Sequence, residues 1–212
     1  MSNKRIVLLK VAVFLACLGP LAHLGWKAYT DNLGANPIEV VTRATGDWIL
    51  RFLLITLTIT PLRKLSGQPW LIRFRRMLGL FAFFYACLHF TTYIWLDQFF
   101  DWAAMLKDVG KRPFITAGFT GFVLMIPLAL TSTSWAIRRM GGKNWTRLHS
   151  LIYASGIAGV VHYLWLVKAD ITLPVIYASI LGVLLLYRVA AWGIPTFKAR
   201  RSRLPQSATE AR

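Results

Sequence analysis

Six runs of mainly apolar residues divide the chain, and each is close to the length that a helix needs to cross a bilayer. They cover residues 6–28, 47–62, 77–96, 114–135, 150–167 and 171–192. A helix rises about 1.5 Å per residue, so roughly 17 to 25 apolar residues span the hydrocarbon core. The chain is 56% hydrophobic and only 16% charged, which is too apolar for a soluble domain. The sequence therefore predicts an all-α integral membrane protein, a bundle of six transmembrane helices.

Charged residues are distributed unevenly between the two sides of this expected bundle. With the N-terminus in the cytoplasm, 18 of the 25 Lys and Arg residues and one of the eight acids fall on the cytoplasmic side. The other side carries seven basic and seven acidic residues. Cytoplasmic loops are enriched in Lys and Arg, so we expect an even number of spans with both termini cytoplasmic. The net charge of +17 is then a topology signal at the lipid headgroups, and nucleic-acid binding is not expected.

One membrane domain, residues 1–195, accounts for most of the chain, and a basic, disordered cytoplasmic tail is expected over 196–212. The first apolar run resembles a signal peptide, but it is long and lacks a good cleavage site. We therefore interpret it as a retained first span. The longest connections, about 29–46 and 97–113, contain turn-forming residues and are expected to be loops.

Four histidines, His23, His89, His149 and His162, lie in or beside the expected spans, where ionisable side chains usually have a function. Alternating topology places His89 about 12 Å and His162 about 9 Å from the outer boundary, on helices that run in the same direction. The two imidazoles could bind one planar cofactor from both faces, as axial ligands of a non-covalent heme do. We expect both to be metal ligands, with His23 as the substitute if one fails.

A second group of candidates lies at the cytoplasmic side. His149 precedes His162 by 13 residues, so on a straight helix the two face different directions. Either His149 lies in an irregular first turn, or the helix bends, or His149 has another role. Two ligand levels about 20 Å apart would suit two hemes. Arg75, unlike Arg76, shares a helix face with His89 and would pair a heme propionate or a phosphate, unless both arginines anchor lipid headgroups.

Other metal centres and transport functions have less support. No carboxylate lies deep in an expected span, and no His-x-x-x-His or Glu-x-x-His pair occurs, so zinc and di-iron sites lack ligands. Cys17 and Cys87 lie outside any CxxC motif and are expected to be ordinary small apolar residues. A cofactor-free assembly or transport protein, which would purify colourless, stays open as an alternative.

Several motifs resemble the ferric-reductase-type transmembrane family. In LTSTSWAIRRMGGKNWTRLHSLIY, residues 130–153, Thr-Ser closes one span and Gly-x-x-Trp-x-x-Leu-His-x-Leu-x-Tyr opens the next. Together with ITPLRKLSGQPWLIRFRRMLGL, ACLHFTTY, KRPFITAGF and VVHYLWLVK, it is similar to the heme-binding membrane subunits of bacterial periplasmic methionine-sulfoxide reductase systems. The resemblance covers about residues 30 to 190.

This resemblance implies an inner-membrane b-type cytochrome with one or two hemes b. It would take electrons from the quinone pool and pass them to a periplasmic molybdopterin-containing methionine-sulfoxide reductase, MsrP, which repairs oxidised periplasmic proteins. This chain would then be an electron-transfer subunit without substrate catalysis of its own. By motif match, His89, His149 and His162 fall on the family's heme histidines, and Arg75 and Arg76 on its arginine pair.

The resemblance alone implies FMN. Electrons would enter near Arg75 and His149, from quinol or flavin, and leave from the level of His89 and His162. Two related functions stay open: a stand-alone cytochrome with a different acceptor, and a ferric reductase, which would need an attached flavin and nucleotide domain.

Overall fold

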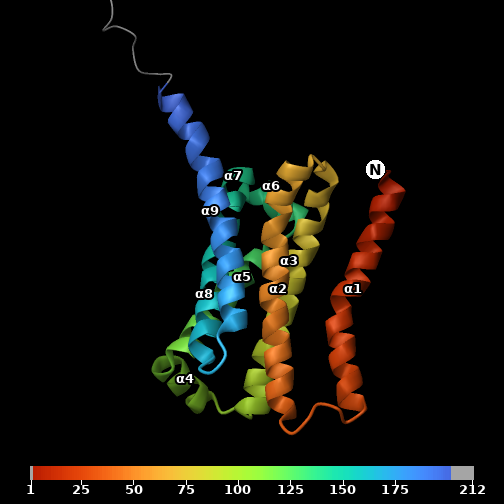
Figure 1. Ribbon diagram of the computed structural model, residues 1–212, viewed down its shortest axis with the longest axis vertical. Coiled ribbons are helices and arrows are strands. Elements are labelled where there is room, and N and C mark those ends of the chain that lie inside the picture. Colours follow the sequence, from red (N-terminus) through yellow and green to blue (C-terminus); the bar gives the residue numbers. More distant parts are fainter. Residues whose placement is uncertain (1, 202–212) are drawn as a thin grey trace, which may run out of the picture.

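The computed structural model describes residues 2–201, with side chains through residue 191, and this part of the chain is helical without any strand (Figure 1). Six long helices run side by side: α1 (Asn3–Tyr29), α2 (Pro37–Ser66), α3 (Ile72–Thr92), α5 (Pro113–Leu130), α8 (Leu151–Leu166) and α9 (Thr172–Arg201). Shorter helices lie at the ends of this bundle: α4 (Trp102–Lys111) at one end, and α6 (Ser134–Met140) and α7 (Gly142–His149) at the other.

Four helical segments of the described chain are long and apolar enough to cross a membrane: Asn3–Tyr29, Pro69–Asp97, Pro113–Leu130 and Thr172–Ala191. The second of these is α3 with a 3-10 turn before it and a π-helical turn, Tyr93–Asp97, after it. Of the other two long helices, α2 carries Asp47 and Arg51 within its apolar stretch, and α8 has only 16 residues. The expectation of an all-helical membrane protein is therefore confirmed.

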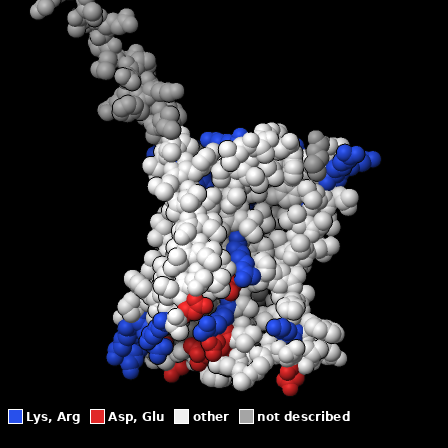
Figure 2. Space-filling model, in the orientation of Figure 1, with Lys and Arg blue, Asp and Glu red and all other residues white. Residues whose placement is uncertain are grey.

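The surface agrees with a membrane environment. Many large apolar side chains point outward, among them Leu8, Leu15, Val183 and Leu186, each more than 60% exposed. Figure 2 shows charged side chains mainly at the two ends of the molecule, and on this face the acidic ones lie toward the end that carries α4. Lipid tails are as apolar as the outer surfaces of the helices, so the hydrophobic effect does not decide which helices meet. Packing and hydrogen bonds between helices determine the arrangement.

Helix α1 is attached to the core by a hydrogen-bonding tyrosine. The Tyr85 hydroxyl donates to the Cys17 carbonyl at 2.9 Å and accepts from the Leu21 amide at 3.2 Å. In an undisturbed helix these two backbone groups would bond to each other. The Tyr85 hydroxyl thus replaces one backbone hydrogen bond of α1. Pro20 lies beside this position and cannot donate a backbone hydrogen bond itself.

Helix α2 contains Pro61 and continues past the expected end of the second span at residue 62. Pro61 has no amide hydrogen, so the Leu57 carbonyl loses its helical donor. Arg188 of α9 replaces that donor, with its Nη2 2.9 Å from the Leu57 oxygen. Because the freed carbonyl is satisfied from another helix, α2 remains helical through Ser66.

Both long connections expected to be loops contain helix. Helix α2 already begins at Pro37, where Asn36 caps the first turn by accepting from the Glu39 amide. Helix α4 lies within 97–113 and is capped by Asp101. A short capped helix such as α4 is hard to distinguish from a loop by hydropathy alone. At the other end of the chain, α9 extends to Arg201, and the rest of the expected tail, 202–212, lies outside the described residues.

Candidate functional site

Two of the four histidines face each other inside the bundle. His89 of α3 and His162 of α8 have ring centres 6.2 Å apart, with the ring planes at 79°. Both side chains are half-buried. The structure thus brings together the two histidines that the sequence placed at one level.

Each of these imidazoles is held by a backbone carbonyl of a neighbouring helix. His89 Nδ1 lies 3.0 Å from the carbonyl oxygen of Thr42 in α2, and His162 Nδ1 lies 2.6 Å from that of Phe114 in α5. A carbonyl only accepts, so in both rings Nδ1 carries the hydrogen and donates it. Nε2 is then left with a free lone pair, the form in which histidine binds a metal.

A glycine makes room for each ring. A Cβ on Gly46 would lie 3.2 Å from Cε1 of His89, and a Cβ on Gly118 only 2.7 Å from Nδ1 of His162. In each case the glycine follows the accepting carbonyl, of Thr42 or Phe114, by four residues. Since helical side chains lie over the turn before them, any other residue there would cover that carbonyl.

The pair fits the axial ligands of a heme. Two imidazoles that share one metal ion, each about 2 Å away through Nε2, have ring centres roughly 6 Å apart. Among the described residues, no group of three or more His, Cys, Asp or Glu side chains converges to hold a metal. A metal bound by only two protein ligands must bring its other ligands with it, and a porphyrin supplies four.

His149 lies at the opposite end of the bundle and in a different setting. It is the last residue of α7, and α8 begins at Leu151, so the straight-helix spacing from His162 does not apply. Trp145 stacks on the ring with centres 3.8 Å apart, and Nε2 lies 3.0 Å from the Thr131 hydroxyl. That hydroxyl already donates to the Pro127 carbonyl at 2.6 Å, so it accepts from His149.

Arg75 lies close to this second level. Burial and the positive charge of Arg75 lower the pKa of His149, which favours the neutral imidazole. Arg75 is half-buried and within electrostatic reach of Tyr153 and Arg188, whereas Arg76 is exposed. The helix phase predicted this difference between the two neighbouring arginines.

His23 does not join either group. Its side chain is exposed on α1, and it makes no side-chain hydrogen bond with another described residue. The role of a substitute ligand therefore has no support in this arrangement.

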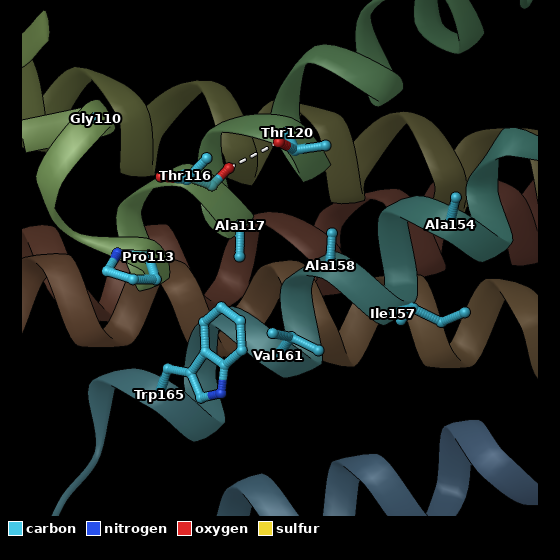
Figure 3. A pocket seen from close by; sticks show the side chains of 10 residues that line it. All are labelled: Gly110, Pro113, Thr116, Ala117, Thr120, Ala154, Ile157, Ala158, Val161 and Trp165. Atoms are coloured by element: carbon cyan, nitrogen blue, oxygen red, sulfur yellow. Dashed lines mark hydrogen bonds between the residues drawn. The ribbon is translucent and has the colours of Figure 1, made fainter.

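An apolar groove of about 550 Å³ lies between α5 and α8, on the outer surface of that helix pair (Figure 3). Thr116, Ala117 and Thr120 of α5 line one wall, and Val161 and Trp165 of α8 line the other. Val161 points into this groove, although its neighbour His162 contacts the opposite side of α5 at Gly118. The groove is thus separate from the histidine pair.

Sequence reasoning missed the residues that orient the ligand candidates. Backbone acceptors such as Thr42 and Phe114 have no residue-specific signature, because any residue offers a carbonyl. Gly118 is visible as a glycine within an expected span, where an unexplained glycine indicates close approach of another group, whereas Gly46 falls at the end of an expected loop. Nothing in the sequence indicates which group approaches.

Comparison with known proteins adds a family relationship. The family model described as "Ferric reductase like transmembrane component" matches residues 45–160. A relative from Herminiimonas arsenicoxydans is 57% identical, over 90% of this chain and 89% of its own length. Relatives from Azospira oryzae and Rhodospirillum rubrum are 56% and 51% identical, covering 89% and 91% of this chain and 81% and 91% of their own. All three are named "Protein-methionine-sulfoxide reductase heme-binding subunit MsrQ". No solved structure gives a significant match.

Proposed function

The chain belongs to the ferric-reductase-like transmembrane family and, within it, to the MsrQ subunits, and from this membership we propose that it is a membrane-bound b-type cytochrome. It passes electrons from the quinone pool to a periplasmic molybdopterin methionine-sulfoxide reductase, MsrP, and so supports the repair of oxidised periplasmic proteins. The observation that carries the proposal is the facing pair His89 and His162, each with Nε2 free.

His89 and His162 are the residues that would hold the iron of a heme b. When bound, the heme supplies an iron that changes oxidation state by one electron. The carbonyls of Thr42 and Phe114 hold the imidazoles in the ligating tautomer and increase their basicity. The chain itself then performs no chemistry on methionine sulfoxide, which is reduced on the partner.

The level of His149 is the proposed site of a second cofactor, a heme b or FMN. Arg75 is placed to pair its anionic group, a propionate or a phosphate, and the exposed Arg76 adds a second cation beside it. His149 contacts the same cofactor, as ligand or as hydrogen-bond partner. FMN at this site rests on the resemblance of the sequence to its family.

The proposed topology has six spans in the bacterial inner membrane and both termini in the cytoplasm. The charge asymmetry supports it, and so does the position of α2 and α8 alongside the four clearly apolar spans. Residues 1–195 form the single heme-binding domain in this proposal, and the basic segment after it is the cytoplasmic tail.

The reduced-minus-oxidised visible spectrum of the detergent-purified protein, with heme per chain, tests the cytochrome. A b-type spectrum is expected, and a colourless protein from heme-replete cells would overturn the proposal. Methionine-sulfoxide reduction driven by a quinol, measured with and without MsrP, tests the acceptor. Electron transfer to other acceptors at the same rate with and without MsrP would favour a stand-alone cytochrome.

A further inference from the structure

A charged and aromatic cluster lies in the apolar flank between α2 and α9. Arg51 donates from Nε to the Tyr177 hydroxyl at 3.0 Å, and its guanidinium lies over the Trp48 ring, 4.8 Å from the centroid. Its Nη2 is 3.8 Å from Oδ2 of Asp47. Figure 2 shows charged side chains extending up an otherwise uncharged flank over α2 and α9. We call Asp47, Trp48, Arg51 and Tyr177 the flank cluster.

The flank cluster is open to the surroundings. The side chains of Arg51 and Asp47 are 39% and 23% exposed. Asp47 is the first residue of the expected span 47–62, and Arg51 lies one helical turn inside it. An ionisable group inside a span is costly and usually has a function. The 3.8 Å separation is too long for a direct hydrogen bond, whereas Arg43 and Glu39 on the same helix approach to 2.7 Å. The carboxylate and the guanidinium of the flank cluster therefore keep capacity for another polar molecule.

The flank cluster also adjoins the histidine pair. Asp47 follows Gly46, whose backbone lies against the His89 ring. Tyr163 follows His162 and lies beside the Asp47 carboxylate. A molecule bound here would lie beside residues that adjoin both imidazoles. Quinol electrons would then enter at the level of the histidine pair, which differs from the entry near Arg75 and His149 that the family resemblance implies.

We propose that the flank cluster binds the head group of a quinol that enters from the lipid. This inference rests on the proposed use of the quinone pool. A hydroquinone hydroxyl donates to the Asp47 carboxylate, and the opposite ring oxygen accepts from the Arg51 guanidinium, which the Trp48 ring supports from beneath. Exposed Ile176 and Ile180 of α9, beside Tyr177, offer an apolar path for the tail.

The groove between α5 and α8 is the competing location, and its chemistry fits less well. The Thr116 hydroxyl donates to the Val109 carbonyl of α4, and the Thr120 hydroxyl donates to the Thr116 carbonyl. No ionisable side chain lines this groove, so it offers no carboxylate to a quinol hydroxyl. The tail of a lipid fits it better than a hydroquinone head group.

Two readouts on the heme-loaded protein in detergent test the inference. The first is covalent labelling by a photoreactive azidoquinone, mapped by mass spectrometry. The second is the rate at which decylubiquinol reduces the bound heme, with dithionite reduction and heme per chain as folding controls. Asp47→Asn and Arg51→Gln are compared with Arg43→Gln, which alters an exposed ion pair about two turns earlier on α2.

We expect labels on α2 and α9 beside the flank cluster. Asp47→Asn and Arg51→Gln each weaken labelling and slow quinol reduction about tenfold or more, because each removes a charge-assisted hydrogen bond. Arg51→Lys, which keeps the charge, recovers part of the rate, and Arg43→Gln behaves as the wild type.

Labels confined to the groove at Trp165 would overturn the inference. Unchanged rates and labelling in both Asp47→Asn and Arg51→Gln would do the same. In either case quinol could still be the electron donor, bound at another site. A wild-type protein that is labelled at the flank cluster but not reduced by quinol would support the binding site and overturn the proposed donor. If Asp47→Asn loses heme, Tyr177→Phe, which removes only one hydroxyl, replaces it and is expected to weaken labelling.

Discussion

His89 and His162 are held by the same device on two different helix pairs. His89 of α3 donates to a carbonyl of α2, and His162 of α8 donates to a carbonyl of α5. In each pair a glycine four residues after the acceptor leaves space for the ring. Helices α2 with α3, and α5 with α8, are also the most extensively packed pairs among the described helices. The sequence shows no repeat, yet the structure repeats one histidine-holding arrangement.

Replacing either histidine of the pair is expected to release the heme. His89→Ala and His162→Ala each remove one of only two protein ligands, so heme affinity should fall at least about tenfold. The measurement is the reduced-minus-oxidised spectrum with heme per chain. His23→Ala is the matched control and should keep the spectrum. Loss of the spectrum in His23→Ala, with an unaffected His89→Ala, would show that the ligand assignment is wrong.

Alanine at the two glycines should weaken cofactor binding in a graded way. In Gly118→Ala the new Cβ would meet His162 Nδ1 at 2.7 Å, and in Gly46→Ala it would meet His89 at 3.2 Å. We expect heme affinity to fall about 10- to 100-fold for Gly118→Ala and less for Gly46→Ala, because the ring and its hydrogen bond are displaced. Gly182→Ala, which adds a Cβ in open space, should bind normally. Equal heme content in all three variants would contradict this account.

Arg188 and Pro61 should be energetically coupled. Arg188→Met removes the donor to the Leu57 carbonyl and is expected to lower the free energy of unfolding by about 1.5–3 kcal/mol. In a Pro61→Ala background, the new amide can bond to Leu57 within α2, so the same change should cost less. The measurement is a double-mutant cycle by denaturation in detergent, and additive effects would argue against the link.

The level of His149, the proposed site of a second cofactor, should respond separately from the histidine pair. His149→Ala and Arg75→Gln are expected to lower the content of the second cofactor, heme or FMN, while the spectrum of the heme at His89 and His162 persists. Bound heme and flavin per chain are measured after purification. Arg73→Gln is the control, because Arg73 is exposed and bonds to Asn3. An equal loss in Arg73→Gln would indicate a general effect of positive charge at the headgroups.

The six-span topology can be tested with single cysteines in a Cys17→Ser, Cys87→Ser background. Lys107→Cys, in the loop that carries α4, is expected to react with an impermeant maleimide from the periplasm. Lys143→Cys, at the start of α7, is expected to react only after the inner membrane is opened. The proposed orientation follows from charge, because the side that carries Lys107 also carries seven acids, whereas basic residues predominate around Lys143. The opposite labelling pattern would show that the orientation is inverted.

The sequence determined the helical class, the approximate spans and the level of the histidine pair. Hydrophobic length and charge distribution are local properties, and alternating topology converts them into depth. Helix phase also predicted that Arg75, and not Arg76, shares a helix face with His89. The sequence did not indicate that α2 stays helical past Pro61, because the donor that replaces the missing Pro61 amide comes from Arg188, 127 residues later.

Only the tertiary structure decided how the site is built. The orientation of His89 and His162 depends on carbonyls at Thr42 and Phe114, which lie 47 and 48 residues away along the chain. Every residue carries a carbonyl, so no residue pattern marks these two. The break before α8, which gives His149 a setting of its own, and the approach of Arg51 to Tyr177 likewise depend on helix packing. In lipid, where apolar faces are nearly equivalent, such hydrogen bonds and glycine contacts determine which helices meet.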